Sequence, residues 1–259
     1  YTAASDRSVK SSYEQGARRG MPVELLDRAG MEAATGTARY SSALLDRRGG
    51  HVNPLGYARG LAQAAQQAGA RVHGATKVRR IARQGRDWQI ETGTGTVTAE
   101  KLVLATNGYT DDLWPQLKRT IVPVFSGIVA TEPIPDEIAR QVLPIRSSVY
   151  ELGSVTVYYR LDEQNRLLIG GRCQQRPVSS PEEMKFLIRY ALRLWPQLKP
   201  FKFTHGWNGQ LAVTTDHYPH IHEPADGVLV CLGYNLRGVA MSTFMGAEMA
   251  NHITDGTSS

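Results

Sequence analysis

The hydrophobic and polar positions of the chain follow helical spacing at first. Residues 1–45 are mostly polar with a partial apolar face, and they predict a helical segment. The pattern breaks sharply at residues 49–54, which predict a short extended segment that ends in a turn. Apolar residues then recur at helical spacing and predict a helix over 55–68, ended by Gly69 at the position that favours glycine.

Between residues 70 and 105 the spacing becomes that of short strands. The predicted strands cover residues 71–73, 78–82, 88–92, 96–98 and 101–105. The last of them is almost wholly apolar, which is typical of a strand buried on both faces.

Longer alternating strands fill the second half of the chain. They are predicted over residues 126–131, 155–161 and 166–171, with a hairpin at 162–165. A helix over 181–195 is predicted to cover this antiparallel sheet, because its apolar residues form one stripe that packs into the core. An apolar run at 228–232 then predicts a buried strand, which leads into a helix over 239–253.

This order of elements predicts a mixed fold, α/β with α+β character, in two interleaved domains. A domain of the nucleotide-binding α/β type is predicted from residues 46–116 and 206–259, at both ends of the chain. An antiparallel-sheet domain, residues 117–205, is inserted between these two parts. Residues 1–45 are predicted to form a separate helical segment.

The composition narrows the class of protein. With 41% hydrophobic and 21% charged residues, the chain has the make-up of an ordinary globular protein. No apolar run reaches the roughly 18 residues of a membrane span. The net charge of +6 comes from scattered Lys and Arg, which favours a solvated basic face over a nucleic-acid interface.

The polar start of the chain and the two cysteines bear on its compartment. Residues 1–10 lack the apolar core of a secretory signal. Cys173 and Cys231 each lie in an apolar, strand-like run and are predicted to be buried, reduced thiols of a cytoplasmic protein. A disulfide between them is the alternative.

Two strand ends carry residues suited to ligand binding. The buried strand 228–232 continues through Gly233-Tyr234-Asn235-Leu236-Arg237-Gly238 into a helix, and helix N-termini attract negative charge. A plain connection is the alternative interpretation of this turn. The strand 101–105 ends in Thr106-Asn107-Gly108, and ligands of α/β sheets bind beyond the carboxyl ends of strands. His217, His220 and His222 do not have the spacing of metal ligands, so we predict no metal site.

In this order, several of these pieces resemble the D-amino-acid oxidase-like superfamily of FAD-dependent oxidoreductases, which includes glycine and sarcosine oxidases and gamma-glutamylputrescine oxidoreductase. The resemblance runs from about Gly50 to the end of the chain. The segments that carry it are Gly50-His51-Val52-Asn53-Pro54, Gly69-Ala70-Arg71-Val72, the strand 102–108, and Trp207, Gly209, Thr214, Asp216, Pro219 and Gly233 to Val239.

The resemblance implies an FAD-binding domain of Rossmann type with an inserted substrate domain. It implies that FAD contacts the following residues: Val78, Ala105, Thr106, Asn107, Gly108, Gly209, Gly233, Tyr234, Asn235, Leu236, Arg237, Gly238 and Val239. Candidate substrate contacts are Arg172, Tyr159 and Trp207. The guanidinium of Arg172 has a shape that binds a carboxylate through two hydrogen bonds, although a surface position is the alternative. Trp207 is interpreted either as a shield for the flavin or as a core residue, and Tyr158 and Tyr159 point to opposite faces of one strand.

Departures from the family pattern change the expectations. No Gly-x-Gly-x-x-Gly fingerprint is present, since Gly93-Thr94-Gly95 lacks a third glycine and lies in a hairpin, so the Rossmann-like domain is expected to be incomplete. Gly209 stands where members with covalent flavin have a cysteine, which implies non-covalent FAD. Leu211 and Ala240 stand where other members place a basic residue, which favours a secondary amine or a γ-glutamyl amine over a simple α-amino acid.

The activity implied by the resemblance is oxidation of an amine or amino-acid C–N bond. A hydride passes from the carbon that bears the amine to the flavin, and water hydrolyses the resulting imine. The electron acceptor is oxygen or a carrier. The alternative is a non-catalytic fragment or binding module that keeps a relict flavoprotein fold.

Overall fold

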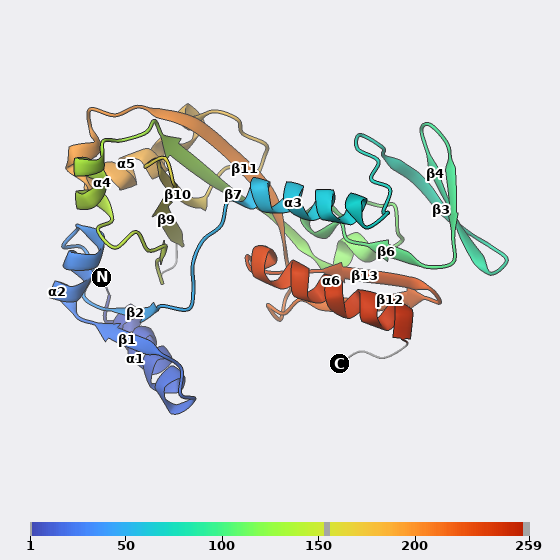
Figure 1. Ribbon diagram of the computed structural model, residues 1–259, viewed down its shortest axis with the longest axis horizontal. Coiled ribbons are helices and arrows are strands. Elements are labelled where there is room, and N and C mark those ends of the chain that lie inside the picture. Colours follow the sequence, from blue (N-terminus) through green and yellow to red (C-terminus); the bar gives the residue numbers. More distant parts are fainter. Residues whose placement is uncertain (1, 153–155, 256–259) are drawn as a thin grey trace. The chain divides into compact units, whose positions relative to one another are not determined.

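The computed structural model describes residues 2–152 and 156–255. The chain forms two compact units, each made of two segments (Figure 1). Unit 1 contains Tyr1–Asn53 and Phe125–Gly209, and unit 2 contains Pro54–Val124 and Gln210–Ser259. Residues 1–45, which the sequence predicted as a separate segment, are grouped here with the central part of the chain.

Unit 1 opens with two helices and a strand pair. Their bounds are α1, Ala3–Arg18; β1, Val23–Leu26; α2, Arg28–Thr35; and β2, Ala43–Asp46. The prediction of a helical segment over residues 1–45 is therefore wrong for β1 and β2, which pair antiparallel. The side chain of Asp27 accepts a hydrogen bond from Gly30 N and caps a new helix, so Val23–Leu26 lie outside that helix and pair with β2 instead.

The rest of unit 1 is an antiparallel sheet with covering helices. The strand order is β11-β7-β10-β9-β8. Its elements are β7, Val122–Thr131; α4, Asp136–Val142; β8, Val149–Tyr150; β9, Val157–Leu161; β10, Leu167–Arg172; η3, Pro181–Met184; α5, Lys185–Leu194; η4, Pro196–Leu198; and β11, Phe203–Val213. The predicted hairpin at 162–165 joins β9 to β10, whereas Val155 of the predicted strand lies outside the described residues.

The apolar stripe predicted for the helix over 181–195 is buried. Met184, Leu187, Ala191 and Trp195 are all fully buried in the core of unit 1. The indole N–H of Trp195 donates to the carbonyl oxygen of Thr35 at 2.8 Å, so the end of α2 is attached to the same core.

Unit 2 contains two small sheets and two longer helices. Its elements are α3, Pro54–Gln67; β3, Val78–Gln84; β4, Asp87–Thr92; β5, Thr96–Ala99; β6, Leu102–Leu104; η1, Asn107–Tyr109; η2, Leu117–Thr120; β12, His220–Ala225; β13, Val228–Leu232; and α6, Gly238–Asp255. The sheets have the orders β3-β4-β5 and β12-β13-β6. Helix α3 ends at Gln67, and Gly69 follows it with a positive φ, as the predicted stop requires. The predicted strand 71–73 is irregular, because no described strand pairs with it.

Strand β13 is the central element of unit 2. Val228, Val230 and Leu232 pack on one side against Trp88 and Ile90 of β4. Alternate residues, Leu229 and Cys231, pack on the other side against Met245 and Met249 of α6, so the predicted burial of this strand is confirmed. The prediction of burial on both faces is wrong for β6, where Val103 is 39% exposed, because β6 lies at the edge of its sheet.

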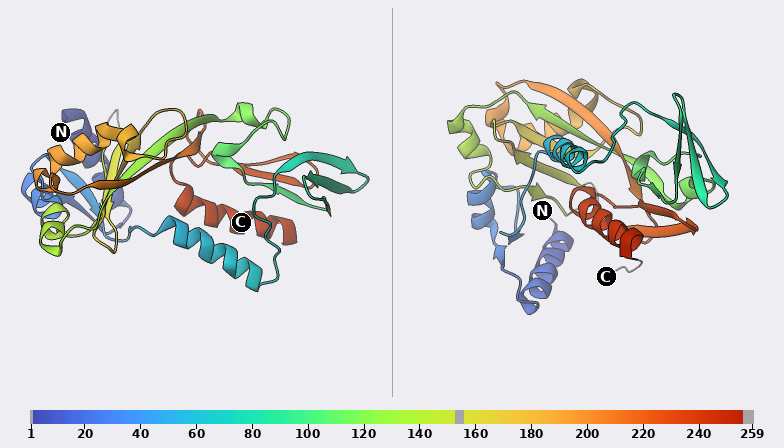
Figure 2. Two further views of the ribbon diagram at one scale, coloured as in Figure 1. Left: turned by 90° about the horizontal axis from the view of Figure 1, so that it is seen from above. Right: turned by 45° about the vertical axis from the view of Figure 1, so that its right-hand side comes forward.

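Helix α3 lies beside α6 (Figures 1 and 2). The hydroxyls of Tyr57 and Thr243 form a hydrogen bond of 2.6 Å between the two helices. No residue of α3 is buried, and its apolar residues Leu55 and Leu61 are exposed. The amphipathic pattern predicted this helix correctly, yet its apolar face has no core to pack against in the described chain.

Candidate functional site

The two predicted ligand-binding turns meet at one edge of a sheet in unit 2. Strand β6 pairs with β13 in parallel, with Leu102 opposite Val228 and Leu104 opposite Val230. Parallel strands end at the same edge, which brings the β6–η1 turn (residues 105–108) next to the β13–α6 turn (residues 233–238). The two turns in which the resemblance implied FAD contacts are thus neighbours in unit 2.

A side chain links the two turns directly. The Asn107 side-chain oxygen accepts a hydrogen bond from Gly233 N at 3.1 Å. Gly233 has φ of 78°, a conformation that glycine adopts without steric cost. A Cβ at this position would lie 2.4 Å from the Thr214 Cγ2 atom, so the turn also has no room for a side chain there.

Asn235 holds the β13–α6 turn from inside. Its side-chain oxygen accepts from Thr214 N at 2.9 Å, and its side-chain nitrogen donates to Thr214 Oγ1 at 3.0 Å and to the Gly233 carbonyl. The φ of Asn235 is 48°, in the left-handed region that asparagine tolerates better than most residues. Both Asn235 and Thr214 are buried, so these hydrogen bonds determine the shape of the turn.

The β6–η1 turn is packed against backbone. A Cβ on Gly108 would lie 2.4 Å from the carbonyl oxygen of Gln210, which explains why only glycine fits. The next residue, Tyr109, accepts a hydrogen bond from Gln210 N through its hydroxyl at 3.1 Å. Ala105 and Thr106 lie between this contact and the end of β6.

The outer side of the β13–α6 turn is open. Leu236, Arg237 and Val239 are exposed, and a Cβ on Gly238 would find its nearest neighbour, Tyr234, at 3.8 Å. Helix α6 begins here, and the first N–H groups of a helix have no partner within it. The site therefore offers backbone donors and the positive end of a helix dipole to a ligand with negative charge.

The segment 214–220 supports this turn. The Arg237 guanidinium donates to the carbonyl oxygen of His217 at 3.1 Å. Asp216 accepts from Tyr218 N and lies 3.1 Å from a ring nitrogen of His220, and these contacts lower the pKa of Asp216 to about 2. His220 stacks on His222, and no group of three or more potential metal ligands exists in the part of the chain that the structure describes.

The predicted substrate contacts belong to unit 1. Arg172 ends β10 and is exposed, and within the described ranges no carboxylate forms an ion pair with it. Trp207 on β11 is 42% exposed, so it is not a core residue, and Gly209 follows on the same strand. Their roles at a substrate stay predictions.

Tyr159 has a different position from the one expected of a substrate contact. It is only 2% exposed, packs edge-on against Trp195 with 5.0 Å between ring centroids, and donates its hydroxyl proton to Tyr40. The adjacent Tyr158 points to the other face of β9, where its hydroxyl lies 2.9 Å from that of Ser126. Alternation along the strand predicted the two faces but not which of them is the core.

The remaining predicted contact, Val78, starts β3 in unit 2. It is half-buried, pairs with Thr92 and packs against the core around Trp88. Cys173 and Cys231 are both free thiols, as predicted, although Cys173 is only half-buried. No helix among the described residues is long and apolar enough to cross a membrane.

Known proteins with similar sequences are oxidoreductases. A probable oxidoreductase, OrdL, of Rhizobium meliloti (strain 1021) is 30% identical over 256 residues, which cover 96% of this chain and 59% of the relative. The gamma-glutamylputrescine oxidoreductase of Escherichia coli (strain K12) is 30% identical over 229 residues, 88% of this chain and 54% of the relative. The chain thus spans less than two thirds of the length of these relatives.

Solved structures share the fold. Glycine oxidase from Geobacillus kaustophilus superposes with a TM-score of 0.82 at 22% identity, over 96% of this chain and 68% of that protein. L-proline dehydrogenase from P. horikoshii superposes with a TM-score of 0.83 at 19% identity, over 100% of this chain and 71% of that protein. The family profile described as DAO, FAD dependent oxidoreductase, matches residues 1–252. The chain therefore belongs to the DAO family of FAD dependent oxidoreductases.

Proposed function

We propose that the complete protein oxidises the C–N bond of an amine or amino acid with non-covalently bound FAD. The observation that carries the proposal is the hydrogen bond between Asn107 and Gly233, which joins the ends of β6 and β13 beside the open start of α6. The names of the relatives support the substrate class, since glycine oxidase and gamma-glutamylputrescine oxidoreductase are named for an amino acid and an amine derivative.

The residues of unit 2 fit one end of FAD. At Gly238 the absence of a side chain leaves the start of α6 open, so a flat ring system can approach its N–H groups. Exposed Leu236 and Val239 supply apolar contacts beside it. The 259 residues contain no Gly-x-Gly-x-x-Gly run, so the residues that would bind the pyrophosphate are not among them.

In the proposed reaction, bound FAD supplies the hydride acceptor. The N–H groups at the start of α6 would stabilise negative charge at the ring edge, and the Asn235–Thr214 hydrogen bonds keep these donors in place. Arg172 would bind a carboxylate of the substrate through its guanidinium. Loss of hydride from the carbon that bears the amine leaves an iminium ion, which water hydrolyses to a carbonyl compound and an amine with release of a proton.

The substrate class within this proposal is a secondary amine or a γ-glutamyl amine. It is supported by Leu211 and Ala240, which offer no charge where other members of the resembling family place a basic residue. Oxygen and a carrier protein both remain proposed acceptors. The two free thiols support the proposed cytoplasmic location.

The visible absorption spectrum of bound flavin tests the function. FAD is added to the 259-residue chain and to the complete gene product, and then a panel of amines and amino acids is added without oxygen. Bleaching of the flavin band in the complete protein is the expected result. Bleaching that air fails to reverse would indicate a carrier as acceptor. A complete protein that binds no FAD, or that no amine bleaches, would overturn the proposal in favour of a binding module.

A matched pair of variants tests the position of the ring. Gly238→Leu places a side chain at the start of α6 and is expected to abolish FAD retention by the complete protein. Gly246→Leu is the control, because it makes the same change two turns further along α6, where a Cβ has no neighbour within 4 Å. Retention of FAD by Gly238→Leu would contradict this placement.

A further inference from the structure

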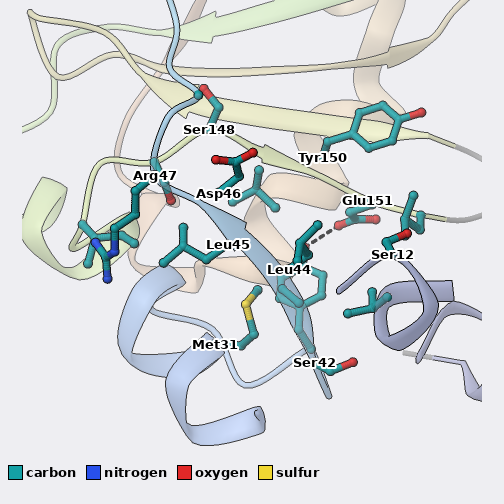
Figure 3. Close-up of a pocket in the computed structure, with 18 of the residues that line it drawn as sticks. Ser12, Met31, Ser42, Leu44, Leu45, Asp46, Arg47, Ser148, Tyr150 and Glu151 are labelled. Carbon is teal, nitrogen blue, oxygen red and sulfur yellow. Dashed lines mark hydrogen bonds between the residues drawn. The ribbon is translucent and has the colours of Figure 1, made fainter. Parts of the chain in front are cut away.

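A second site is indicated by a cavity that lies wholly in unit 1. It has a volume of about 750 Å³ and is enclosed by α1, β2 and the segment 145–152 (Figure 3). Cavities of this size hold small organic ligands. All of its lining residues belong to unit 1, so the cavity is described independently of the turns of unit 2.

A buried carboxylate lines this cavity. Glu151 is 4% exposed, and its two oxygens accept hydrogen bonds from the Tyr190 hydroxyl at 2.8 and 2.7 Å and from the Tyr40 hydroxyl. Tyr159 donates to Tyr40 at 2.5 Å, and Arg39 donates to Tyr190 at 3.0 Å. Every proton in this chain of hydrogen bonds points toward the carboxylate, which is the arrangement that an ionised glutamate requires.

The tyrosines keep their protons. Burial raises the pKa of Tyr40, Tyr159 and Tyr190 well above the usual value of a phenol. They therefore act as donors at neutral pH, and none of them supplies positive charge. Among the described residues, no lysine, arginine or histidine forms a direct ion pair with Glu151, although Arg39 interacts with it electrostatically and donates to the same Tyr190 hydroxyl.

The remaining charges of the lining leave an excess of negative charge. Asp6 accepts from the Ser42 and Ser41 hydroxyls, which lowers its pKa and keeps it ionised. Of the two lining arginines, Arg47 pairs with Glu24 at 2.7 Å, whereas Arg146 donates to the neutral amide of Asn165 at 2.7 Å and so keeps its positive charge.

Two further residues of the lining, His51 and Asp46, add no positive charge to it. Burial lowers the pKa of His51, so its ring is neutral at pH 7. Asp46 has its pKa lowered to about 2 by Arg48, with which it forms an ion pair of 2.7 Å. The lining therefore holds three carboxylates and two guanidiniums, and Glu151 forms no ion pair with either guanidinium.

Apolar side chains form the rest of the wall. Met31, Leu44 and Leu45 line the cavity, with the two leucines on opposite faces of β2 (Figure 3), and Val9 and Ile145 add to them. An anionic group beside an aliphatic wall is complementary to an alkyl chain that carries an ammonium group. We propose that this cavity binds an aliphatic ammonium ion, with the nitrogen beside Glu151 and the alkyl chain against the apolar residues of the lining.

Calorimetric titration of the 259-residue chain without FAD tests this proposal separately from the flavin chemistry. The probe is 1,4-diaminobutane, and 1,4-butanediol is the uncharged control of equal length. The diamine is expected to bind and the diol is not. Glu151→Gln should weaken binding of the diamine about tenfold or more, because it removes the charge that pairs with the ammonium. Glu137→Gln, at an exposed position of α4 outside the lining, should leave binding unchanged.

A second pair of variants decides the result if Glu151→Gln disturbs the fold. Leu45→Trp places a larger side chain in the lining while leaving the hydrogen-bonded tyrosines intact, and Phe186→Trp places a tryptophan at an exposed position of α5, outside the lining. Near-UV circular dichroism verifies the fold of each variant. Loss of diamine binding only in Leu45→Trp supports the site. Equal binding of diamine and diol, wild-type binding by a folded Glu151→Gln, or wild-type binding by Leu45→Trp would each overturn it.

Discussion

Asn235→Ala is expected to destabilise the β13–α6 turn more than a substitution at an exposed position would. The substitution removes both hydrogen bonds between the side chain and Thr214. Thr214 is 4% exposed, so its N–H is left buried without that partner, which costs about 1–3 kcal/mol. Alanine in the left-handed region, at φ of 48°, adds about 1 kcal/mol.

Together these effects lower the free energy of opening the turn by about 2–4 kcal/mol. Because each 1.4 kcal/mol corresponds to about a tenfold change, amide hydrogen exchange in this segment should become roughly 30 to 1,000 times faster. Mass spectrometry of peptides that cover residues 210–218 and 228–239 measures this rate locally. A local measurement is needed because two units need not unfold together.

Two further variants make the result specific. Asn251→Ala, at an exposed position of α6, should change exchange in the turn by less than about threefold. Asn235→Gly restores the backbone freedom and should recover about 1 kcal/mol of the loss. If Asn235→Ala exchanged at 210–218 within threefold of the wild type, the side chain would not hold the turn and the reasoning would be refuted.

Three other predictions concern single residues. Gly108→Ala should destabilise unit 2 by about 1–3 kcal/mol, because its Cβ would lie 2.4 Å from the Gln210 carbonyl oxygen. Gly60→Ala in α3, where a Cβ has no neighbour within 4 Å, should stabilise the helix by about 0.5–1 kcal/mol. Thermal unfolding followed by circular dichroism compares the two variants. The pKa of Asp216 is lowered from 3.8 to about 2, so its stabilising effect is complete above about pH 4 and is lost as the pH falls through about 2. Hydrogen exchange of the Tyr218 amide should become faster over that pH range than in the Asp216→Asn variant. Parallel pH profiles of the two proteins would refute this. Arg172→Ala should raise KM for an anionic substrate in the complete protein while leaving kcat nearly unchanged. An unchanged KM would show that Arg172 is a surface residue that does not contact the substrate.

The spacing of apolar residues was enough to predict those elements whose sequence pattern is local. The helix 55–68, the buried strand 228–232 and the hairpin at 162–165 follow from periodicity and turn residues alone. That both turns belong to one site was implied by the family resemblance, and the parallel pairing of β6 with β13 brings their carboxyl ends to one edge.

Features that depend on a distant partner could not be predicted. Strand β1 forms because β2 supplies its hydrogen-bond partners, and no local sequence pattern indicates this pairing. The exposure of Val103 depends on the place of β6 in the sheet order. Glu151 and Tyr40 are 111 residues apart, and their hydrogen bond has no counterpart in the spacing of the sequence.

The exposed helix α3 has a consequence for how this part of the chain behaves in water. Helices shorter than about 12–15 residues are marginally stable without tertiary packing, and α3 has 14 residues and no buried side chain. Its hydrogen bond from Tyr57 to Thr243 adds only a modest attachment. The fraction of time that residues 54–67 spend as a helix therefore depends on what covers Leu55 and Leu61, and proteases should cut this segment first when nothing does.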